Sequence, residues 1–423
     1  MTHSPFTLPR PAQDRFSRLS AMKTCSWPRL GGLLILTAVL AGCDSSSSSS
    51  SEFLDLIRRP VTDHIYPGIS VAVGNATDGV VAAAAYGQAD LNTGTLLTVE
   101  TPMRMASVSK SVTAVAILML AQAGTVSLNT SVDTYVPEYT AYGKQITLRQ
   151  LLSHTSGIPG HAHGDPVLHG DGPITDDEFF AKLNATPLYA APGTGWDYSN
   201  ENYYLLAKVV EHVSGQTFAD WLNQKVFQPA GMTTRSYSDT GQINAAVPLG
   251  YVNRLKSDPF LQCAAPHWSG EVGAGGIIAT PSDMVRFDVA VFGGLLLDTE
   301  RRAEMVRTVA DLGGGAGYAL GWFTYPRGIV KHDGDFTTIA TSNTIFPDGT
   351  FVVEAANAAH MGPDFDRLYF ATQLQNLYGK TPLPSGTPNP PSLLDMFEPF
   401  TTCQQIDDML YRPGAKILQK SDR

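Results

Sequence analysis

Ser107 and Lys110 are the residues of this chain whose types and spacing most directly predict nucleophilic chemistry. A spacing of three places both side chains on one face of a helix. A serine hydroxyl is a weak nucleophile at neutral pH, and a lysine in a partly desolvated pocket can take its proton. The helix N-terminus adds free backbone N–H groups and the positive end of the helix dipole, where an acyl oxyanion would be stabilised.

A strongly apolar helix over residues 107–123, ending at Gly124, is predicted to carry this pair. The same Ser-x-x-Lys pattern occurs at Ser20 and Lys23, so the motif alone identifies nothing. The position of Ser107 before a buried helix favours the second copy. The alternative is a buried helix whose first turn holds Ser and Lys by chance.

Composition describes a globular, loop-rich protein. Hydrophobic residues make up 43% of the 423 residues and charged residues only 16%, which is enough apolar material for a large core. The formal net charge of −10 makes nucleic acid or an anionic membrane surface a poor electrostatic partner.

The N-terminal region has the pattern of an export signal. Positive residues precede the apolar segment 30–40, which is too short for a comfortable membrane span. The sequence from Leu40 to Cys43 resembles a bacterial lipobox, in which the cysteine is lipidated, and the serines of 45–51 would form a flexible tether. We therefore expect an N-terminal extension and signal peptide at 1–42 and a lipid-anchor cysteine with its tether at 43–52. The protein would then be a bacterial lipoprotein whose folded part lies outside the cytoplasm, which is the periplasm in a Gram-negative cell. A plain secretory signal is the alternative.

Cys263 and Cys403 would be the cysteines left in the mature protein besides the lipidated one. In an exported protein they can form a disulfide. Neither belongs to a Cys-x-x-Cys motif, so cysteine gives no support for redox catalysis or a structural zinc site.

Strand patterns occur near both ends of the chain, and a mainly helical block lies between them at about 113–270. We predict an α/β (α+β) fold in which one antiparallel sheet is assembled from both ends, flanked by helices, with the helical block inserted as a lobe. The folded domain would span 53–380, and a Pro-rich tail would follow at 381–423. The expected strands are 68–74, 80–86, 318–325, 329–332, 338–346 and 350–356.

Two further motifs extend the Ser–Lys pair. Tyr198-Ser-Asn200 follows a Gly/Pro loop in the helical block, and His332-Asp-Gly334 ends a strand near the C-terminus. Each has a second copy elsewhere, at 251–253 and 360–362, but the order and setting of the first copies fit better.

The loop at 161–173 is rich in His and Asp. We interpret it as a loop over the site; a metal site is the alternative. The residues that such a metal site would use are His161, His163, Asp165, His169 and Asp171.

Through these motifs the chain resembles the serine β-lactamase and penicillin-binding superfamily, in the branch of class C β-lactamases, D-alanyl-D-alanine carboxypeptidases and carboxylesterases. The resemblance covers about residues 53–380 and implies a β-lactamase/transpeptidase-like fold. It rests on the order of the three motifs and on connecting segments, which are Ala106-Ser-Val-Ser-Lys-Ser, Leu151-Leu-Ser-His-Thr-Ser-Gly, Pro192-Gly-Thr-Gly-Trp-Asp-Tyr-Ser-Asn, Gly231-Met-Thr and Ala274-Gly-Gly-Ile-Ile-Ala-Thr.

The resemblance also implies roles for single residues. Ser107 would be the acylated nucleophile, and Lys110 and Tyr198 would share its proton transfer. Asn200 would hydrogen-bond the lysine and the substrate amide or ester. The remaining positions would bind substrate on the last strand of the site: His332, Asp333, Gly334 and Asp335, the backbone N–H of Asp335 forming an oxyanion hole with that of Ser107.

Asp333 departs from the family pattern, because relatives that bind carboxylates usually carry Ser or Thr there. A carboxylate at this position, with Asp335 close by, would favour neutral esters or amides over anionic substrates. The alternative is that Asp333 points away from the site, as strand alternation permits, and forms a salt bridge.

These observations predict an exported, membrane-tethered serine hydrolase that forms an acyl-enzyme at Ser107 and acts on an ester or amide, as a carboxylesterase, D-amino-acid amidase or peptidase, or β-lactamase. The partners would be a small molecule or a peptidoglycan-type peptide, and the membrane through the lipid of Cys43; the prediction includes no metal or other cofactor. The competing hypothesis is a penicillin-binding or sensing lipoprotein that is acylated but deacylates slowly or not at all.

Overall fold

The computed structural model describes residues 37–40, 47–164, 167–168, 173–234, 236–237, 247–253, 259–263, 268–336, 338–360 and 366–381. A large antiparallel sheet is its central element. Its order is β1-β3-β2-β15-β14-β13-β12-β11-β10, with β4 paired to β3. The strands of this sheet are β1 (Thr37–Leu40), β2 (Gly68–Asn75), β3 (Gly79–Asp90), β4 (Thr95–Leu96), β10 (Ala310–Gly313), β11 (Ala316–Tyr318), β12 (Phe323–Thr324), β13 (Val330–Phe336), β14 (Ile339–Ile345) and β15 (Thr350–Ala356).

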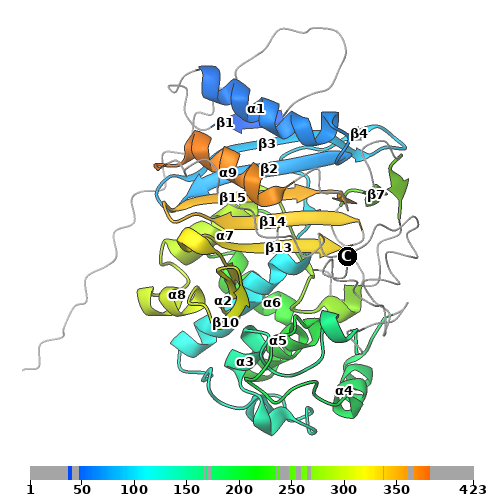
Figure 1. Ribbon diagram of the computed structural model, residues 1–423, viewed down its shortest axis with the longest axis vertical. Helices are drawn as coiled ribbons and strands as arrows, with labels where there is room; N and C mark the ends of the chain where they lie inside the picture. The colour runs from blue at the N-terminus through cyan, green and yellow to red at the C-terminus, as the bar shows by residue number, and fades with distance from the viewer. Residues whose placement is uncertain are drawn as a thin grey trace, which may run out of the picture. The chain divides into compact units, whose positions relative to one another are not determined.

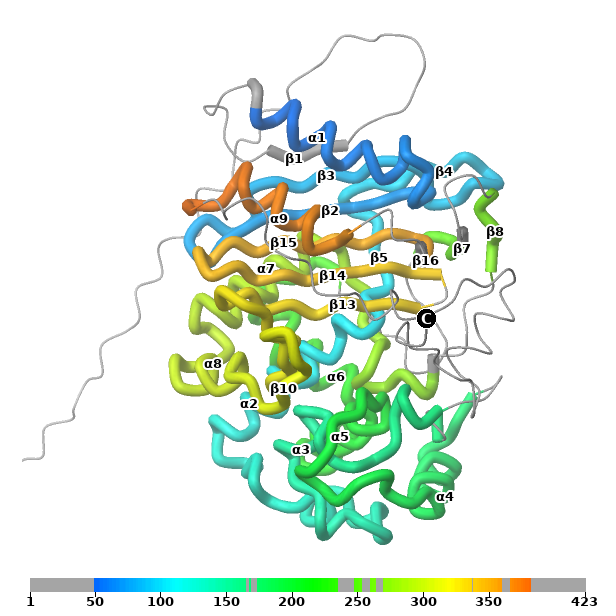
Figure 2. The backbone as a smooth tube through the Cα atoms, in the orientation of Figure 1, coloured from blue at the N-terminus to red at the C-terminus, as the bar shows by residue number. Residues whose placement is uncertain are grey.

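Both ends of the chain contribute to this sheet, as the sequence predicts. Strand β2 from the N-terminal part pairs with β15 from the C-terminal part, with Val71 opposite Glu354. Figures 1 and 2 show the blue and orange strands side by side in the upper part of the molecule. The mixed fold with a large antiparallel sheet is confirmed.

Helices cover the two faces of the sheet. On one face, α1 (Ser47–Thr62) and α9 (Arg367–Tyr378) pack on the sheet through a shared core that includes Phe53, Val71 and Leu374. On the other face, α2 (Ser109–Gln122) and α7 (Pro281–Phe292) join a larger core that includes Ala72 and Val353. Neighbouring residues of β2, Val71 and Ala72, thus enter different cores, as strand alternation requires.

The helical block between the two groups of strands forms the lower part of Figure 1. Thr147 and Thr175 begin its α3 and α4 with capping boxes, in which the threonine hydroxyl accepts from the third backbone N–H of the helix. The described helices here are α3 (Leu148–Leu152), α4 (Asp176–Ala185), α5 (Asn200–Ser214) and α6 (Phe218–Leu222), followed by a π-helical turn at Asn223–Phe227.

Shorter elements complete the described structure. Helix α8 (Thr299–Met305) precedes β10, and two three-stranded sheets have the orders β5-β9-β6 and β16-β7-β8. The strands of the small sheets are β5 (Met103–Arg104), β6 (Ser236–Tyr237), β7 (Tyr251–Asn253), β8 (Leu261–Gln262), β9 (Ile277–Ala279) and β16 (Ala358–His360).

Two local expectations need correction. The segment 318–325, predicted as one strand, forms β11 and β12, because the chain turns between them at Gly321 with a left-handed φ of 81°. Helix α1 begins at Ser47, so most of the serine tract expected to be a flexible tether is helical. The segment Thr37–Leu40 pairs with β3 as an edge strand, and its cleavage as part of an export signal stays a prediction.

The predictions for Cys43 and for the tail beyond 381 concern residues outside the described part. Across the described residues, none of the helices combines the length and the apolar composition needed to span a membrane.

Candidate active site

Ser107 lies in a 3-10 turn, Ala106–Val108, that leads directly into α2. The helix itself is buried along most of its length, and its polar residues are tied to surrounding backbone: the Ser111 hydroxyl donates to the Gly321 carbonyl at 2.9 Å and the Thr113 hydroxyl to the Gly273 carbonyl at 2.6 Å. These buried bonds fix the helix, and with it the serine at its start.

Lys110 is fully buried and its ammonium group donates to three acceptors. The Nζ atom lies 3.0 Å from Ser107 Oγ, 2.7 Å from Asn200 Oδ1 and 3.1 Å from the Ala274 carbonyl. A lysine ammonium has three protons, so these contacts orient it completely. Asn200 is the first residue of α5, and the helical lobe therefore supplies one side of the site.

Tyr198 closes the site from the loop before α5. Lys110 Nζ lies 4.7 Å from the centroid of its ring, and its side chain is almost fully buried. Burial raises the pKa of the Tyr198 hydroxyl well above its usual value, and a hydrogen bond with Ser107 offsets part of that rise. The phenol is therefore neutral at pH 7, which suits a proton relay between Ser107 and Lys110 better than a standing phenolate.

His332 lies on the face of β13 that is turned toward Tyr198, and it is buried as a neutral imidazole. Its Nδ1 contacts the Asp333 carbonyl at 2.7 Å and its Nε2 contacts the Tyr318 hydroxyl at 3.1 Å, so Nδ1 carries the proton and Nε2 accepts. Burial lowers the pKa of His332 to about 3, and the positive charge of Lys110 makes a smaller contribution in the same direction.

Gly334 brings β13 against the serine. A Cβ placed on it would lie 2.4 Å from the Met105 carbonyl oxygen and 3.1 Å from the Ser107 nitrogen, so only glycine permits this approach. The Thr341 hydroxyl on β14 donates to the same Met105 carbonyl at 2.8 Å. The backbone that follows Gly334 thus lies beside the backbone of Ser107.

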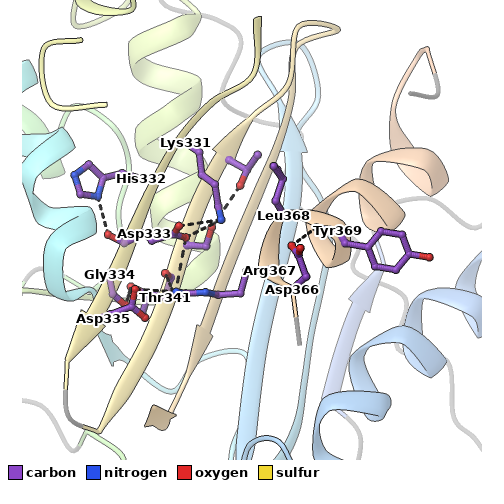
Figure 3. Close-up of polar contacts among 12 residues, drawn as sticks. Lys331, His332, Asp333, Gly334, Asp335, Thr341, Asp366, Arg367, Leu368 and Tyr369 are labelled. Atoms are coloured by element: carbon purple, nitrogen blue, oxygen red, sulfur yellow. Dashed lines mark hydrogen bonds and ion pairs between the residues drawn. The ribbon is translucent and has the colours of Figure 1, made fainter. Parts of the chain in front are cut away.

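Asp333 and Asp335 have their carboxylates on the opposite face of β13, where α9 packs (Figure 3). Asp333 pairs with Lys331 at 2.9 Å, and Asp335 pairs with Arg367 at 2.8 Å. The expectation that their charges line the site is therefore wrong, because alternation turns residues 331, 333 and 335 away from the face that carries His332. The alternative for Asp333, a salt bridge on the face away from the site, is confirmed.

The loop that begins at His161 lies next to the site. The His161 ring stacks on Tyr198 with centroids 5.1 Å apart, and the His163 Nδ1 lies 2.6 Å from the Asp197 carboxylate. Within the described residues, no group of three or more His, Cys, Asp or Glu side chains is arranged to hold a metal ion. Asp165, His169 and Asp171 of the alternative metal site lie outside the described residues.

Several residues near the site were not identified from sequence as functional. Tyr318, Phe323 and Trp196 form an aromatic cluster around Tyr198, and His154 lies 4.5 Å from the Tyr198 ring. Their signal in the sequence was limited to an aromatic-rich strand and the Leu-Leu-Ser-His segment. Cys263 is disulfide-bonded, and Cys403, its expected partner, lies outside the described residues.

Comparison with known proteins agrees with this fold. The family model described as Beta-lactamase matches residues 53–376, more than half of the chain. The chain belongs to the beta-lactamase family, which includes serine hydrolases.

Curated relatives are similar over part of their length. Penicillin-binding protein 4* of Bacillus subtilis (strain 168) is 28% identical over 275 residues, which are 60% of this chain and 60% of the relative. Protein flp of Staphylococcus aureus is 28% identical over 210 residues, 49% of this chain and 42% of the relative. The chain thus spans about half the length of the curated relatives it matches.

Solved structures share the fold. The octameric penicillin-binding protein homologue from Pyrococcus abyssi has a TM-score of 0.64 and 25% identity, covering 79% of this chain and 78% of that one. D-amino acid amidase from Ochrobactrum anthropi SV3 has a TM-score of 0.63 and 23% identity, covering 73% and 92%. EstCE1, a hydrolase with promiscuous acyltransferase activity, has a TM-score of 0.65 and 19% identity, covering 78% and 98%.

Proposed function

We propose that this protein is a serine hydrolase that forms an acyl-enzyme at Ser107 and cleaves an ester or an amide. The observation that carries the proposal is the contact between Ser107 Oγ and Lys110 Nζ at 3.0 Å, with Tyr198 hydrogen-bonded to the same serine. A nucleophile, a buried cation and a neutral phenol meet at one point. This is the arrangement that activated-serine catalysis needs.

The proposed reaction has two stages. Ser107 Oγ attacks the substrate carbonyl carbon, and its proton passes through Tyr198 and Lys110 to the leaving alkoxide or amine as the ester or amide bond breaks. Water then attacks the acyl carbon, and the bond between that carbon and Ser107 Oγ breaks. One water proton returns to Ser107 through the same groups, and the acyl group leaves as a carboxylic acid. The backbone N–H groups of Ser107 and Asp335 are the proposed oxyanion donors, and losing one such donor typically costs about 100- to 1000-fold.

Three observations support the proposed substrate class. The charges of Asp333 and Asp335 face α9, so they do not oppose an anionic substrate. The rings of Tyr198, Tyr318 and Phe323 pack together as an apolar cluster, and Tyr198 is hydrogen-bonded to Ser107. Support for an ester or amide also comes from structural neighbours named as an amidase and as a hydrolase with acyltransferase activity.

The test uses the folded, exported chain with a chromogenic short-chain ester, a D-amino-acid anilide and a chromogenic cephalosporin. We expect a burst and steady turnover with at least one of the first two, and Ser107→Ala should abolish both. Ser127→Ala is the matched control, because this serine is exposed and lies beyond the end of α2, the helix that begins next to Ser107. Full activity in Ser107→Ala would refute the mechanism.

A penicillin-binding or sensing role is the second candidate, favoured by the relatives named as penicillin-binding proteins. It predicts stoichiometric labelling of Ser107 by a fluorescent penicillin, without turnover. Intact-mass spectrometry of the labelled protein over several hours separates the candidates, since a hydrolase returns to its unmodified mass.

Anchoring through a lipid on Cys43 is also proposed. The Cys43→Ala variant should move from the membrane fraction to the soluble exported fraction while its turnover of the ester stays the same. An unchanged membrane fraction would contradict a lipid anchor at this position.

A further inference from the structure

His154 is a buried residue with unusual backbone geometry. Its side chain is 1% exposed, and its φ of 58° lies in the left-handed region that residues other than glycine rarely adopt. Such a conformation persists only where the surrounding contacts hold it. The contacts of His154 converge on the segment that carries Tyr198.

Both backbone neighbours of Tyr198 are bonded to His154. The Asp197 N–H donates to the His154 carbonyl at 3.1 Å, and the Ser199 N–H donates to the His154 Nδ1 at 3.1 Å. The Tyr198 carbonyl accepts from the His161 N–H at 2.8 Å, so the tyrosine is held on both sides and at its own carbonyl.

The His154 imidazole has a fixed tautomer. Because its Nδ1 accepts from the Ser199 backbone, the ring proton must be on Nε2, and the Asn202 side-chain amide, 3.2 Å away, donates to the same Nδ1. Burial lowers the pKa of His154 well below its usual value, and the positive charge of Lys110 makes a smaller contribution in the same direction. The ring is therefore neutral at pH 7 and adds no charge beside Lys110.

The His154 ring also packs against the phenol itself. Its centroid lies 4.5 Å from the Tyr198 ring at an interplanar angle of 35°, and 4.8 Å from the Tyr318 ring. Backbone and ring of Tyr198 are thus both positioned by one side chain that has no contact with Ser107 among the described interactions.

We propose that His154 is a positioning residue for Tyr198, acting as a neutral hydrogen-bond acceptor that sets the place of the phenol hydroxyl relative to Ser107 and Lys110. This inference rests on the proposed function for its kinetic consequence, because Tyr198 relays the serine proton there. A misplacement of about 1 Å in such a group can cost on the order of 100-fold in rate.

Three substitutions separate the acceptor from the rest of the ring. In His154→Asn the Oδ1 atom occupies the place of Nδ1, and asparagine tolerates the left-handed φ. His154→Gln and His154→Leu have no acceptor at that place. We expect kcat/KM of the asparagine variant within about threefold of wild type, and a loss of about 10- to 100-fold in the other two. Ser153→Ala is the control, since this serine is the neighbour of His154 and its hydroxyl contacts the Arg149 carbonyl and the Thr155 hydroxyl rather than the Tyr198 segment or Asn202.

A double-mutant cycle tests whether the effect passes through the tyrosine. In a Tyr198→Phe background, His154→Gln should reduce kcat/KM by less than about threefold further, because the hydroxyl that it positions is already gone. If His154 had a purely structural role, His154→Gln would lower kcat/KM in the Tyr198→Phe background by the same factor as in the wild type. Equal rates for the Asn and Gln variants, or a full loss in the Phe background, would overturn the proposal.

A spectroscopic measurement keeps the inference independent of the hydrolase proposal. 3-Fluorotyrosine at position 198 should give one sharp ¹⁹F resonance in the wild type and in His154→Asn, and a shifted or broadened one in His154→Gln. If the wild type shows no acylation, the proposed function fails while the ¹⁹F comparison still decides the role of His154. Identical ¹⁹F spectra for the wild type, His154→Asn and His154→Gln would overturn the proposed role of His154. If the leucine variant does not fold, the Asn–Gln pair carries the whole comparison.

Discussion

Replacing Arg367 with methionine should destabilise the protein and weaken its active site together. Arg367 is buried at the start of α9, and its guanidinium donates to the Asp335 carboxylate at 2.8 Å and to the Thr341 carbonyl at 2.9 Å. Figure 3 shows it reaching from α9 to the end of the β13–β14 pair. Removing one partner of a buried ion pair costs about 3–5 kcal/mol, because the other charge stays buried without compensation.

The expected change in melting temperature follows from the size of the folded part. For a domain of roughly 320 residues, the entropy of unfolding near the midpoint is about 0.7 kcal/mol per kelvin, so the loss corresponds to about 4–7 °C. Differential scanning calorimetry at pH 7 measures it. Arg307→Met, at an exposed arginine, is the control and should change the melting temperature by less than about 1 °C.

The pH dependence supplies a second check. Burial raises the pKa of Asp333, but the positive charges of Lys331 and Arg367 outweigh burial and bring it to about 2. A depressed folded-state pKa means that the ionised carboxylate stabilises the fold above its usual pKa of about 4, and that this contribution is lost as the pH falls from about 4 to 2. The difference between wild type and Arg367→Met should therefore shrink over that acid range.

A compensating change distinguishes this account from general disruption of the core. Burial, ahead of all other causes, raises the pKa of Asp335, and removing the guanidinium would raise it further. The double variant Arg367→Met, Asp335→Asn should therefore recover at least half of the lost stability. We also expect kcat/KM to fall about tenfold in the single variant, since the Thr341 hydroxyl holds the Met105 carbonyl next to Ser107. A double variant less stable than the single one would refute the reasoning.

Three further outcomes are expected. Burial raises the pKa of Glu354 to about 8, so the folded state keeps a proton that the unfolded state loses above about 4.5. The free energy of unfolding should therefore fall as the pH rises from about 4.5 to about 8. Urea titrations at each pH measure this slope, and Glu354→Gln should flatten it. Because the Asp333 carboxylate faces α9, Asp333→Ser should lower stability yet leave the kcat/KM ratio of matched neutral and anionic esters unchanged; a ratio shifted more than about threefold would contradict the position of that carboxylate. If Cys263 pairs with Cys403, thiol titration of the unfolded, non-reduced mature protein should find neither cysteine free, and a Cys263→Ala, Cys403→Ala variant should lose about 4–5 kcal/mol in the chain-entropy model of loop closure.

Patterns with strong local periodicity predicted most of the fold. The pairing of segments 68–74 and 80–86, the hairpin turn at Pro347-Asp-Gly349 and the buried helix after Ser107 follow from alternation, turn residues and an apolar run. Helix α8 was missed because its residues are mostly charged and only Met305 is buried, so no apolar face marks it. The turn inside 318–325 was missed because the apolar run continues through it.

The orientation of side chains on β13 needed the structure. Alternation alone states that Asp333 and His332 face opposite ways, but not which of them faces Ser107. That choice depends on Arg367, more than thirty residues further along the chain. The role of His154 was likewise hidden, since its partners at Asp197 and Ser199 meet it only after the helical lobe has folded.

Strand β13 also limits how the gene can change in length. It presents His332 and Gly334 to one side and three ionic residues, Lys331, Asp333 and Asp335, to the other, so a one-residue deletion between 328 and 332 would exchange the two sets. Carboxylates would then face the nucleophile while an imidazole would meet Arg367. Insertions and deletions should consequently be absent from this segment among functional descendants, whereas the turn at 347–349, which joins the next two strands at the surface, can vary in length.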